Sequence, residues 1–160
     1  MHSLLVILLL SLAQAVLART YSNPQVEQLL ASAETPDGVV FELLSRDENT
    51  WTWAAPMIAD LRQQLRNRFP GMDIAVVSHG REQFQLTREK ALQQPEAIST
   101  LNDLVQQGVS LHVCGTHSAW KNVAEDNYIE IVDVASSGPA QINDYVKLGY
   151  VRIRLHPPTE

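Results

Sequence analysis

The stretch Val109-Ser110-Leu111-His112-Val113-Cys114-Gly115-Thr116-His117 decides how the rest of the chain is interpreted. It has the composition of a short buried strand that runs into a glycine turn and then into a helix. Cys114 is the only cysteine in the chain, and it ends the predicted strand. In open α/β sheets, ligands and reacting groups collect at the carboxyl ends of the strands. We therefore expect the functional site of the molecule at this end of the strand.

The segments around this stretch alternate between strand and helix patterns. Strands are predicted over residues 38–44, 73–78, 109–114, 129–134 and 150–155. Helices are predicted over residues 54–69, 98–108, 116–126 and 137–149, and the connection 81–95 has room for a short helix. Pro56 is expected in the first turn of the first helix, where proline is tolerated. The alternation predicts an α/β fold, a three-layer α/β/α sandwich with a five-stranded parallel sheet.

The first residues have the pattern of an export signal. The run from Leu4 to Leu17 is almost wholly apolar, and small residues precede a cleavage site after Ala18. The run is shorter than the roughly 20 apolar residues of a membrane-spanning helix. We expect residues 1–18 to be a signal peptide, and the mature protein to be periplasmic or secreted without stable membrane insertion. An uncleaved anchor is the alternative, because no Lys or Arg precedes the apolar run.

Composition limits the function of the remaining chain. Residues 19–37 are polar and read as an N-terminal arm with one helical turn, and residues 38–156 have the size of a single domain. The net charge of −6 argues against binding to nucleic acid. A single cysteine excludes an internal disulfide. An unpaired thiol in an oxidising compartment must be buried, linked to a partner or used in chemistry.

Cys114 is expected to lie beside two histidines. His79 follows the second predicted strand, and sequential strands are usually neighbours, so His79 and Cys114 are expected at one edge of the sheet. A helix that begins near Thr116 would point its positive end at the sulfur and favour the thiolate form. A protonated His79 or His117 would act in the same direction. The pattern indicates a nucleophilic or sulfur-carrying cysteine, and a small apolar residue that closes the strand is the alternative.

Other kinds of site have weaker support in the sequence. His112, Cys114 and His117 could supply metal ligands, but their spacing is not a standard zinc pattern and no second cysteine supports it. We therefore predict no metal site and no cofactor. The sequence has neither a Walker loop nor a Gly-x-Gly-x-x-Gly motif, so it carries no signature for nucleotides. Ser78 and His79 lack a third member for a serine triad.

Several stretches, taken together and in order, resemble the DsrE/DsrF-like family of small sulfur-handling proteins. They cover about residues 38–155, and they are Val76-Val-Ser-His-Gly80, Ile98-x-x-Leu101-x-x-Leu104 leading into Gly108-Val109, Val113-Cys114-Gly115, Ser137-Gly138 and Leu148-Gly149-Tyr150-Val-Arg-Ile153. The resemblance implies the fold predicted above and assembly into trimers or hexamers. It also implies that Cys114 corresponds to the cysteine that carries persulfide sulfur in the sulfur-relay members.

The sequence departs from those members at two places. They are mostly cytoplasmic, whereas this chain has a predicted export signal, and Thr116-His117-Ser118 stands where relatives often have Asn and an aliphatic residue. The family also contains members outside the characterised sulfur relays.

Two functions follow from these observations. In the first, Cys114 carries sulfane sulfur and exchanges it with a donor or acceptor protein, while His79 and His117 tune protonation. The substrate would then contact residues of the adjoining turns, namely Gly80, Gly115, Thr116, Ser137 and Gly138. In the second, the chain is a non-catalytic oligomeric module for assembly or binding, metal binding included, and Cys114 is structural.

Overall fold

The structure is a computed structural model that describes residues 21–158, so the predicted signal peptide lies outside the described residues. A parallel sheet of five strands forms its centre, in the order β4-β3-β2-β1-β5. The strands are β1 (Gly38–Leu43), β2 (Asp73–Ser78), β3 (Val109–Cys114), β4 (Asp133–Ala135) and β5 (Tyr150–Arg154). The helices are α1 (Pro24–Leu30), α2 (Thr50–Arg68), α3 (Arg88–Ala91), α4 (Pro95–Gln106), α5 (Gly115–Trp120) and α6 (Gly138–Lys147). Two 3₁₀ helices span Arg81–Leu86 and Glu125–Asn127.

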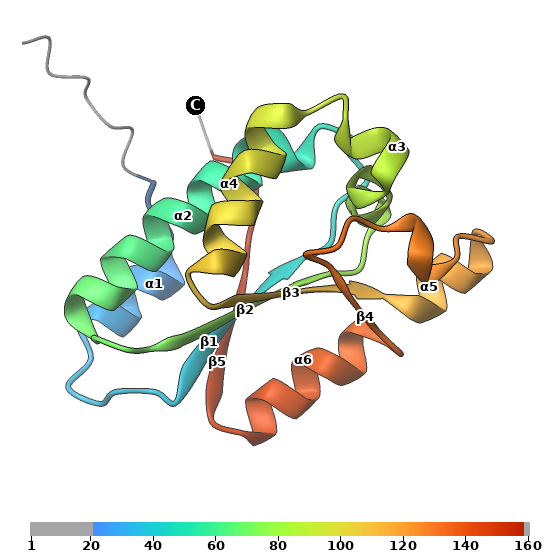
Figure 1. The fold of residues 1–160 in the computed structure, drawn as a ribbon. Coiled ribbons are helices and arrows are strands. Elements are labelled where there is room, and N and C mark those ends of the chain that lie inside the picture. Colours follow the sequence, from blue (N-terminus) through green and yellow to red (C-terminus); the bar gives the residue numbers. More distant parts are fainter. Residues whose placement is uncertain (1–20, 159–160) are drawn as a thin grey trace, which may run out of the picture.

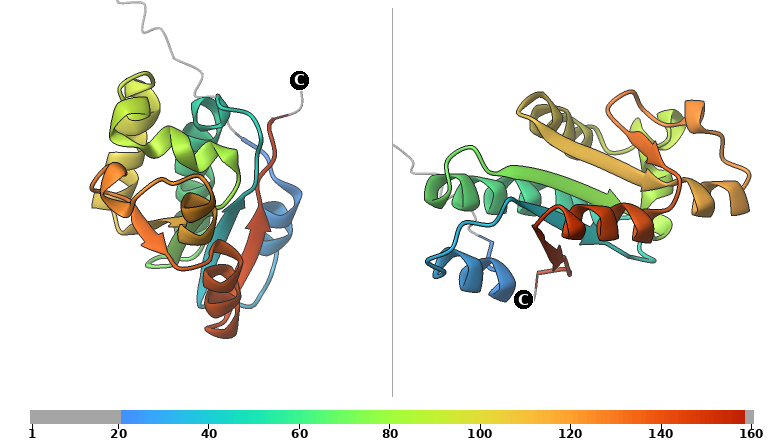
Figure 2. Two further views of the ribbon diagram at one scale, coloured as in Figure 1. Left: turned by 90° about the vertical axis from the view of Figure 1, so that its right-hand side faces the viewer. Right: turned by 90° about the horizontal axis from the view of Figure 1, so that it is seen from below.

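Helices cover both faces of the sheet, which confirms the three-layer α/β/α sandwich (Figures 1 and 2). Alternate residues of β1 pack on opposite sides: Phe41 joins the large core beneath α2 and α4, and Val40 joins a small cluster beneath α6. The small cluster consists of Val40, Ala75, Val77 and Ile142. Because both faces are buried, the central strands are continuous apolar runs, which is why the sequence identified them.

The topology places a crevice beside the end of β3. The segment that leads from α5 to β4 packs on the large core through Tyr128, Val123 and Ile129. The chain leaves β4 in the opposite direction, into α6 on the other face (Figure 1). Adjacent parallel strands whose connections go to opposite faces leave a crevice at their carboxyl ends, where ligands bind in folds of this class. Cys114 is the last residue of β3 at this crevice.

The helix after Cys114 is shorter than predicted. It was expected to reach residue 126 but ends at Trp120, because Asn122 adopts a left-handed conformation with φ of 55°. The N–H of Val123 then donates to the carbonyl of Ser118, which closes the helix in the manner of a Schellman motif. Trp120, expected on a packed side of this helix, is 76% exposed instead.

Several other elements differ from their predicted bounds by a few residues, and two of these differences have a visible cause. The fourth strand was expected over 129–134 but occupies Asp133–Ala135, because Ile129 donates to the carbonyl of Leu86 and the chain turns before it enters the sheet. Helix α2 begins at Thr50, so Pro56 lies in its interior rather than in its first turn. The early start is explained by Trp51, which is fully buried and donates from Nε1 to the carbonyl of Glu82 at 3.0 Å.

The predicted N-terminal arm contributes a helix to the fold. Asn23 caps α1 by accepting hydrogen bonds from the N–H groups of Gln25 and Val26, and Pro24 occupies the first helical position. Val26 is part of the large core, and the N–H of Tyr21 donates to Asp60 of α2 at 2.6 Å. Over residues 21–158, no helix has both the length and the apolar character needed to cross a bilayer.

Candidate functional site

A cavity of about 270 Å³ lies at the carboxyl end of β3. Its lining consists of His79, Cys114, Thr116, His117, Trp120, Ser137 and Pro139. The structure therefore brings together five of the eight site residues predicted from the sequence. Cys114 is only 5% exposed, and its sulfur makes no hydrogen bond to any of the described residues. The thiol is thus recessed below the protein surface and free of polar partners within the described chain.

The other three predicted site residues are glycines with packing roles. Gly138, in the first turn of α6, lies against both side chains of interest: a Cβ at this position would be 2.6 Å from Cβ of His79 and 3.2 Å from Cβ of Cys114. Only glycine lets α6 approach so closely. Gly115 is packed against the carbonyl of Ala135, and Gly80 against Ser45 and Glu82, so these two stand behind the cavity rather than in its lining.

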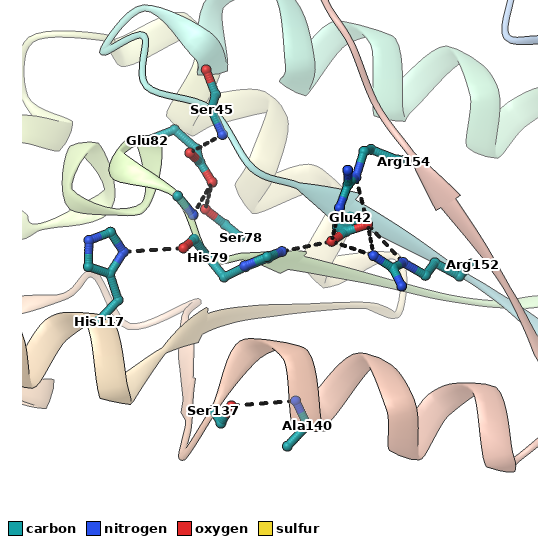
Figure 3. A network of polar contacts seen from close by, with 11 residues as sticks. Glu42, Ser45, Ser78, His79, Glu82, His117, Ser137, Ala140, Arg152 and Arg154 are labelled. Atoms are coloured by element: carbon teal, nitrogen blue, oxygen red, sulfur yellow. Dashed lines mark hydrogen bonds and ion pairs between the residues drawn. The ribbon is translucent and has the colours of Figure 1, made fainter.

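His79 is tied to a charge cluster that the sequence reasoning missed. Its Nε2 lies 2.9 Å from Oε1 of Glu42, a side chain that is 1% exposed (Figure 3). The same carboxylate accepts two hydrogen bonds from Arg152 at 2.8 Å and two from Arg154 at 3.0 Å. Glu42 sits in a strand that otherwise reads as apolar, so no pattern in the sequence revealed its partners on β5.

The cluster lowers the pKa of Glu42 from 4.5 to about 2. Burial opposes ionisation and would raise the pKa, but hydrogen bonds from Arg154, Arg152 and His79 outweigh it. Between about pH 2 and pH 4.5, the folded protein therefore binds fewer protons than the unfolded chain. The corresponding stabilisation is present above the unfolded pKa of 4.5 and is lost as the pH falls toward about 2.

We expect Glu42 to contribute about 3 kcal/mol to the acid-dependent loss of unfolding free energy. Urea unfolding of the wild-type protein and of Glu42→Gln, measured between about pH 5 and about pH 2.5, tests this expectation. The loss over that interval should be smaller in the variant by a large part of this amount. Parallel losses in the two proteins would contradict the role assigned to the carboxylate.

His117 also lines the cavity. Its Nδ1 lies 3.2 Å from the carbonyl oxygen of His79 (Figure 3), and because a carbonyl only accepts, Nδ1 carries the proton. Its ring packs edge-on against Phe84, with centroids 4.9 Å apart, and lies 6.2 Å from the ring of Trp120. The exposed Trp120 thus marks the rim of the cavity next to His117.

Gln83 fixes the backbone of Cys114. Its side chain is fully buried, its Oε1 accepts from the N–H of Cys114 at 2.9 Å, and its Nε2 donates to the carbonyl of Cys114 at 3.2 Å. Nε2 also lies 3.2 Å from Oγ of Ser118, which in turn lies 2.7 Å from the hydroxyl of Tyr128. The pairing of β2 with β3 ends at Val113, so the Gln83 amide makes the hydrogen bonds to Cys114 that a neighbouring strand would otherwise make. Sequence reasoning missed this role, because Gln83 lies in a polar, Gln-rich connection.

Two helix N-termini lie at Cys114, which is itself the N-cap of α5. Thr116 donates both its N–H, at 3.1 Å, and its hydroxyl, at 2.8 Å, to the carbonyl of Ser136, so this amide of α5 is already engaged. The first turn of α6, which begins at Gly138 after the capping residue Ser137, lies directly over Cys114. The positive end of the α6 dipole therefore acts at the site.

His112, one of the residues considered as a metal ligand, contacts a tyrosine instead. Nε2 of His112 lies 2.8 Å from the hydroxyl of Tyr145, and burial lowers the pKa of His112, opposed by the charge of Asp133. In the part of the chain that the structure describes, no three His, Cys, Asp or Glu side chains are grouped closely enough to hold a metal ion. The chemistry that this arrangement supports is that of a recessed thiol next to an imidazole.

Comparisons with known proteins agree with this architecture. The sequence model of the DsrE/DsrF-like family matches residues 14–154. Among solved structures, the chain is similar to MTH1491 of Methanobacterium thermoautotrophicum, a protein of unknown function, with 26% identity and a TM-score of 0.60 over 73% of this chain and 97% of that one. It also matches BT1422 of Bacteroides thetaiotaomicron, of unknown function, with 14% identity and a TM-score of 0.49 over 74% and 95% of the two chains. No curated protein matches.

Proposed function

The chain belongs to the DsrE/DsrF-like family, and we propose that it carries sulfane sulfur as a persulfide on Cys114. The observation that carries this proposal is the placement of the only cysteine at the end of β3, in a cavity that it shares with His79 and His117. A thiol at a crevice between parallel strands is placed for reaction with a ligand. The first turn of α6 above it favours negative charge on the sulfur.

The proposed reaction is a thiol exchange. The thiolate of Cys114 attacks the sulfane sulfur of a donor persulfide, R–S–SH, and the S–S bond of the donor breaks. The donor leaves as the thiolate R–S⁻, and Cys114 keeps the sulfur as Cys–S–SH. Attack by an acceptor thiolate reverses these events and regenerates the free cysteine. No external oxidant or reductant is consumed, which fits a chain with only one cysteine.

The burial of Cys114 supports storage of the sulfur between the two half-reactions. A persulfide is more reactive than a thiol, and the recessed position of Cys114, which is 5% exposed, limits the contact of its sulfur with bulk solvent. The predicted signal peptide places this chemistry in the periplasm or outside the cell, with a donor or acceptor protein as partner. The proposal includes assembly of the chain into a trimer or hexamer.

Release of the carried sulfur as thiocyanate tests the proposal. Wild-type protein is reduced, loaded with polysulfide, freed of excess reagent and treated with cyanide, which converts a protein persulfide to thiocyanate and restores the thiol. We expect about one thiocyanate for each chain, because one cysteine carries one sulfur. Protein alkylated on Cys114 before loading is the control and should release none. Absence of thiocyanate from the unblocked, folded protein would refute sulfur carriage.

A non-catalytic assembly module is the second candidate, and one pair of observations favours it. Cys114 is 5% exposed, whereas Trp120 at the rim of the cavity is 76% exposed. An exposed tryptophan is typical of a contact with a partner or another subunit. In this function the thiol would resist iodoacetamide until the protein is unfolded. Rapid alkylation of the folded protein at neutral pH would count against it, and stoichiometric bound metal after purification would favour its metal-binding variant.

A further inference from the structure

A buried carboxylate lies behind the Cys114 cavity, although the exchange reaction proposed above does not use it. Glu42 projects from β1 onto the face of the sheet that α6 covers, and it is 1% exposed. Burying a carboxylate is costly, and well-packed apolar residues often stabilise a fold as well as a buried ion pair does. Buried charges with specific partners are enriched at functional sites. The position of this one, directly behind His79, points to a role in the chemistry of the cavity.

The contacts of Glu42 fix the protonation pattern of the His79 ring. Arg152 and Arg154 bind the carboxylate through four hydrogen bonds and keep it ionised, so it acts only as an acceptor. Nε2 of His79, 2.9 Å from Oε1 of Glu42, must therefore carry a proton. In the neutral ring this leaves Nδ1 as the nitrogen with a free lone pair. Within residues 21–158, the ring of His79 makes no other hydrogen bond.

The ring of His79 lies near Cys114, in the lining of the same cavity. Ser78 pairs with Val113, so His79 and Cys114 follow as neighbours at the ends of β2 and β3. Both side chains also flank Gly138: a Cβ there would be 3.3 Å from Cγ of His79 and 3.2 Å from Cβ of Cys114. Nδ1 is bonded to that Cγ. Groups of this kind often reach each other only when substrate is bound, or through one water molecule.

We propose that Glu42 is a positioning residue, which holds the His79 ring so that Nδ1 is presented to the Cys114 thiol as its proton acceptor. The proton moves from Sγ to Nδ1, the S–H bond breaks and an N–H bond forms, and no electrons are exchanged. The resulting imidazolium is stabilised by Glu42 and returns its proton to the leaving thiolate of the donor. The inference rests on the function proposed above, because it assigns a proton acceptor to the same cysteine.

The surroundings of His79 determine how this pair responds to pH. The charged and titratable side chains that face His79 are Glu42 of β1, Arg152 and Arg154 of β5, Cys114 of β3 and His117 of α5. The first turn of α6, which also packs on it, contains no charged side chain. The arginines are about half exposed and are screened by water, whereas the carboxylate is buried in direct contact with the ring. Replacing Glu42 should therefore act on Cys114 mainly through His79.

A double-mutant cycle on the alkylation of Cys114 tests this inference. The rate of reaction with iodoacetamide is measured across pH in wild type, Glu42→Gln, His79→Gln and the double variant. We expect each single variant to react roughly tenfold or more slowly near neutral pH and to show a different dependence of the rate on pH. The double variant should match His79→Gln alone, because Glu42 acts through the histidine. Glu48→Gln, the same change at an exposed carboxylate paired with Arg81, should leave the profile unchanged.

Several outcomes would overturn the inference. One is a wild-type pH profile in Glu42→Gln, and another is a further change of rate when Glu42→Gln is added to His79→Gln. Neither outcome depends on sulfur loading. If the wild-type protein loads sulfur but Glu42→Gln keeps the wild-type pH profile, only the role of Glu42 is refuted. If the wild-type protein loads no sulfur but Glu42→Gln has a shifted pH profile, only sulfur carriage is refuted. The imidazole nitrogen spectrum of the wild-type protein provides a test without variants. It should show the Nε2–H tautomer of His79, and an Nδ1–H tautomer would contradict the proposal.

Discussion

Cys114→Ser is expected to abolish sulfur carriage while the protein remains folded. Thiocyanate released after polysulfide loading and cyanide treatment should fall to the level of protein-free buffer, because a hydroxyl does not form a persulfide. The fold should survive, since the Cys114 sulfur makes no hydrogen bond within the described chain and serine is only slightly smaller. We expect the free energy of unfolding to fall by about 1 kcal/mol, the cost of placing a hydroxyl in this recess.

Ser110→Ala is the matched control for this experiment, because Ser110 lies on the same strand and on the same face as Cys114. It should load sulfur like the wild-type protein. Thiocyanate release from Cys114→Ser at the wild-type level would show that the sulfur is held elsewhere. It would remove the basis for assigning a chemical role to the cavity.

Gln83→Leu is expected to be the most destabilising single change near the site. Leucine has a similar volume but leaves the N–H of Cys114 without its partner, and it removes a donor from Ser118. Because an orphaned buried polar group costs about 1–3 kcal/mol, we expect a loss of about 3 kcal/mol in unfolding free energy. Urea unfolding measures this loss, and the alkylation rate of Cys114 should rise as the end of β3 loosens.

Gln85→Leu provides the comparison, because Gln85 lies in the same connection and its side chain is only partly buried. Its effect should stay within about 0.5 kcal/mol. Equal stability of Gln83→Leu and the wild-type protein would mean that the amide does not hold Cys114 in place. The recessed position of the sulfur would then need another explanation.

The sequence predicted the sheet and the neighbourhood of Cys114 well, for a physical reason. Strands buried on both faces are continuous apolar runs, and parallel pairing of β2 with β3 places His79 beside Cys114 without any further information. The closeness of Gly138 also follows from topology, since α6 must begin where β4 ends at the same edge. These features depend on local patterns and on the order of the elements.

The remaining features depend on contacts between distant residues. Glu42 meets Arg152 and Arg154 across more than a hundred residues of chain, and Gln83 meets Cys114 across 31. Buried polar partners leave no periodicity in the sequence, so these residues could not be distinguished from surface side chains. The shortened α5 had a local signal in Asn122, a residue type that tolerates the left-handed conformation, which the helical pattern of residues 116–126 concealed.

The mass of the peptide that contains Cys114 tests the central claim most directly. Trypsin releases residues 91–121, between Lys90 and Lys121, as one fragment that contains the only cysteine of the chain. Folded protein is loaded with polysulfide, alkylated and digested. Sulfur carriage predicts that this fragment gains about 32 Da beyond the alkyl group, the mass of one sulfur atom between Cys114 and the label. A fragment that carries the alkyl group alone, or that remains unmodified because the folded protein never reacted, would contradict the assignment of Cys114 as a sulfur carrier.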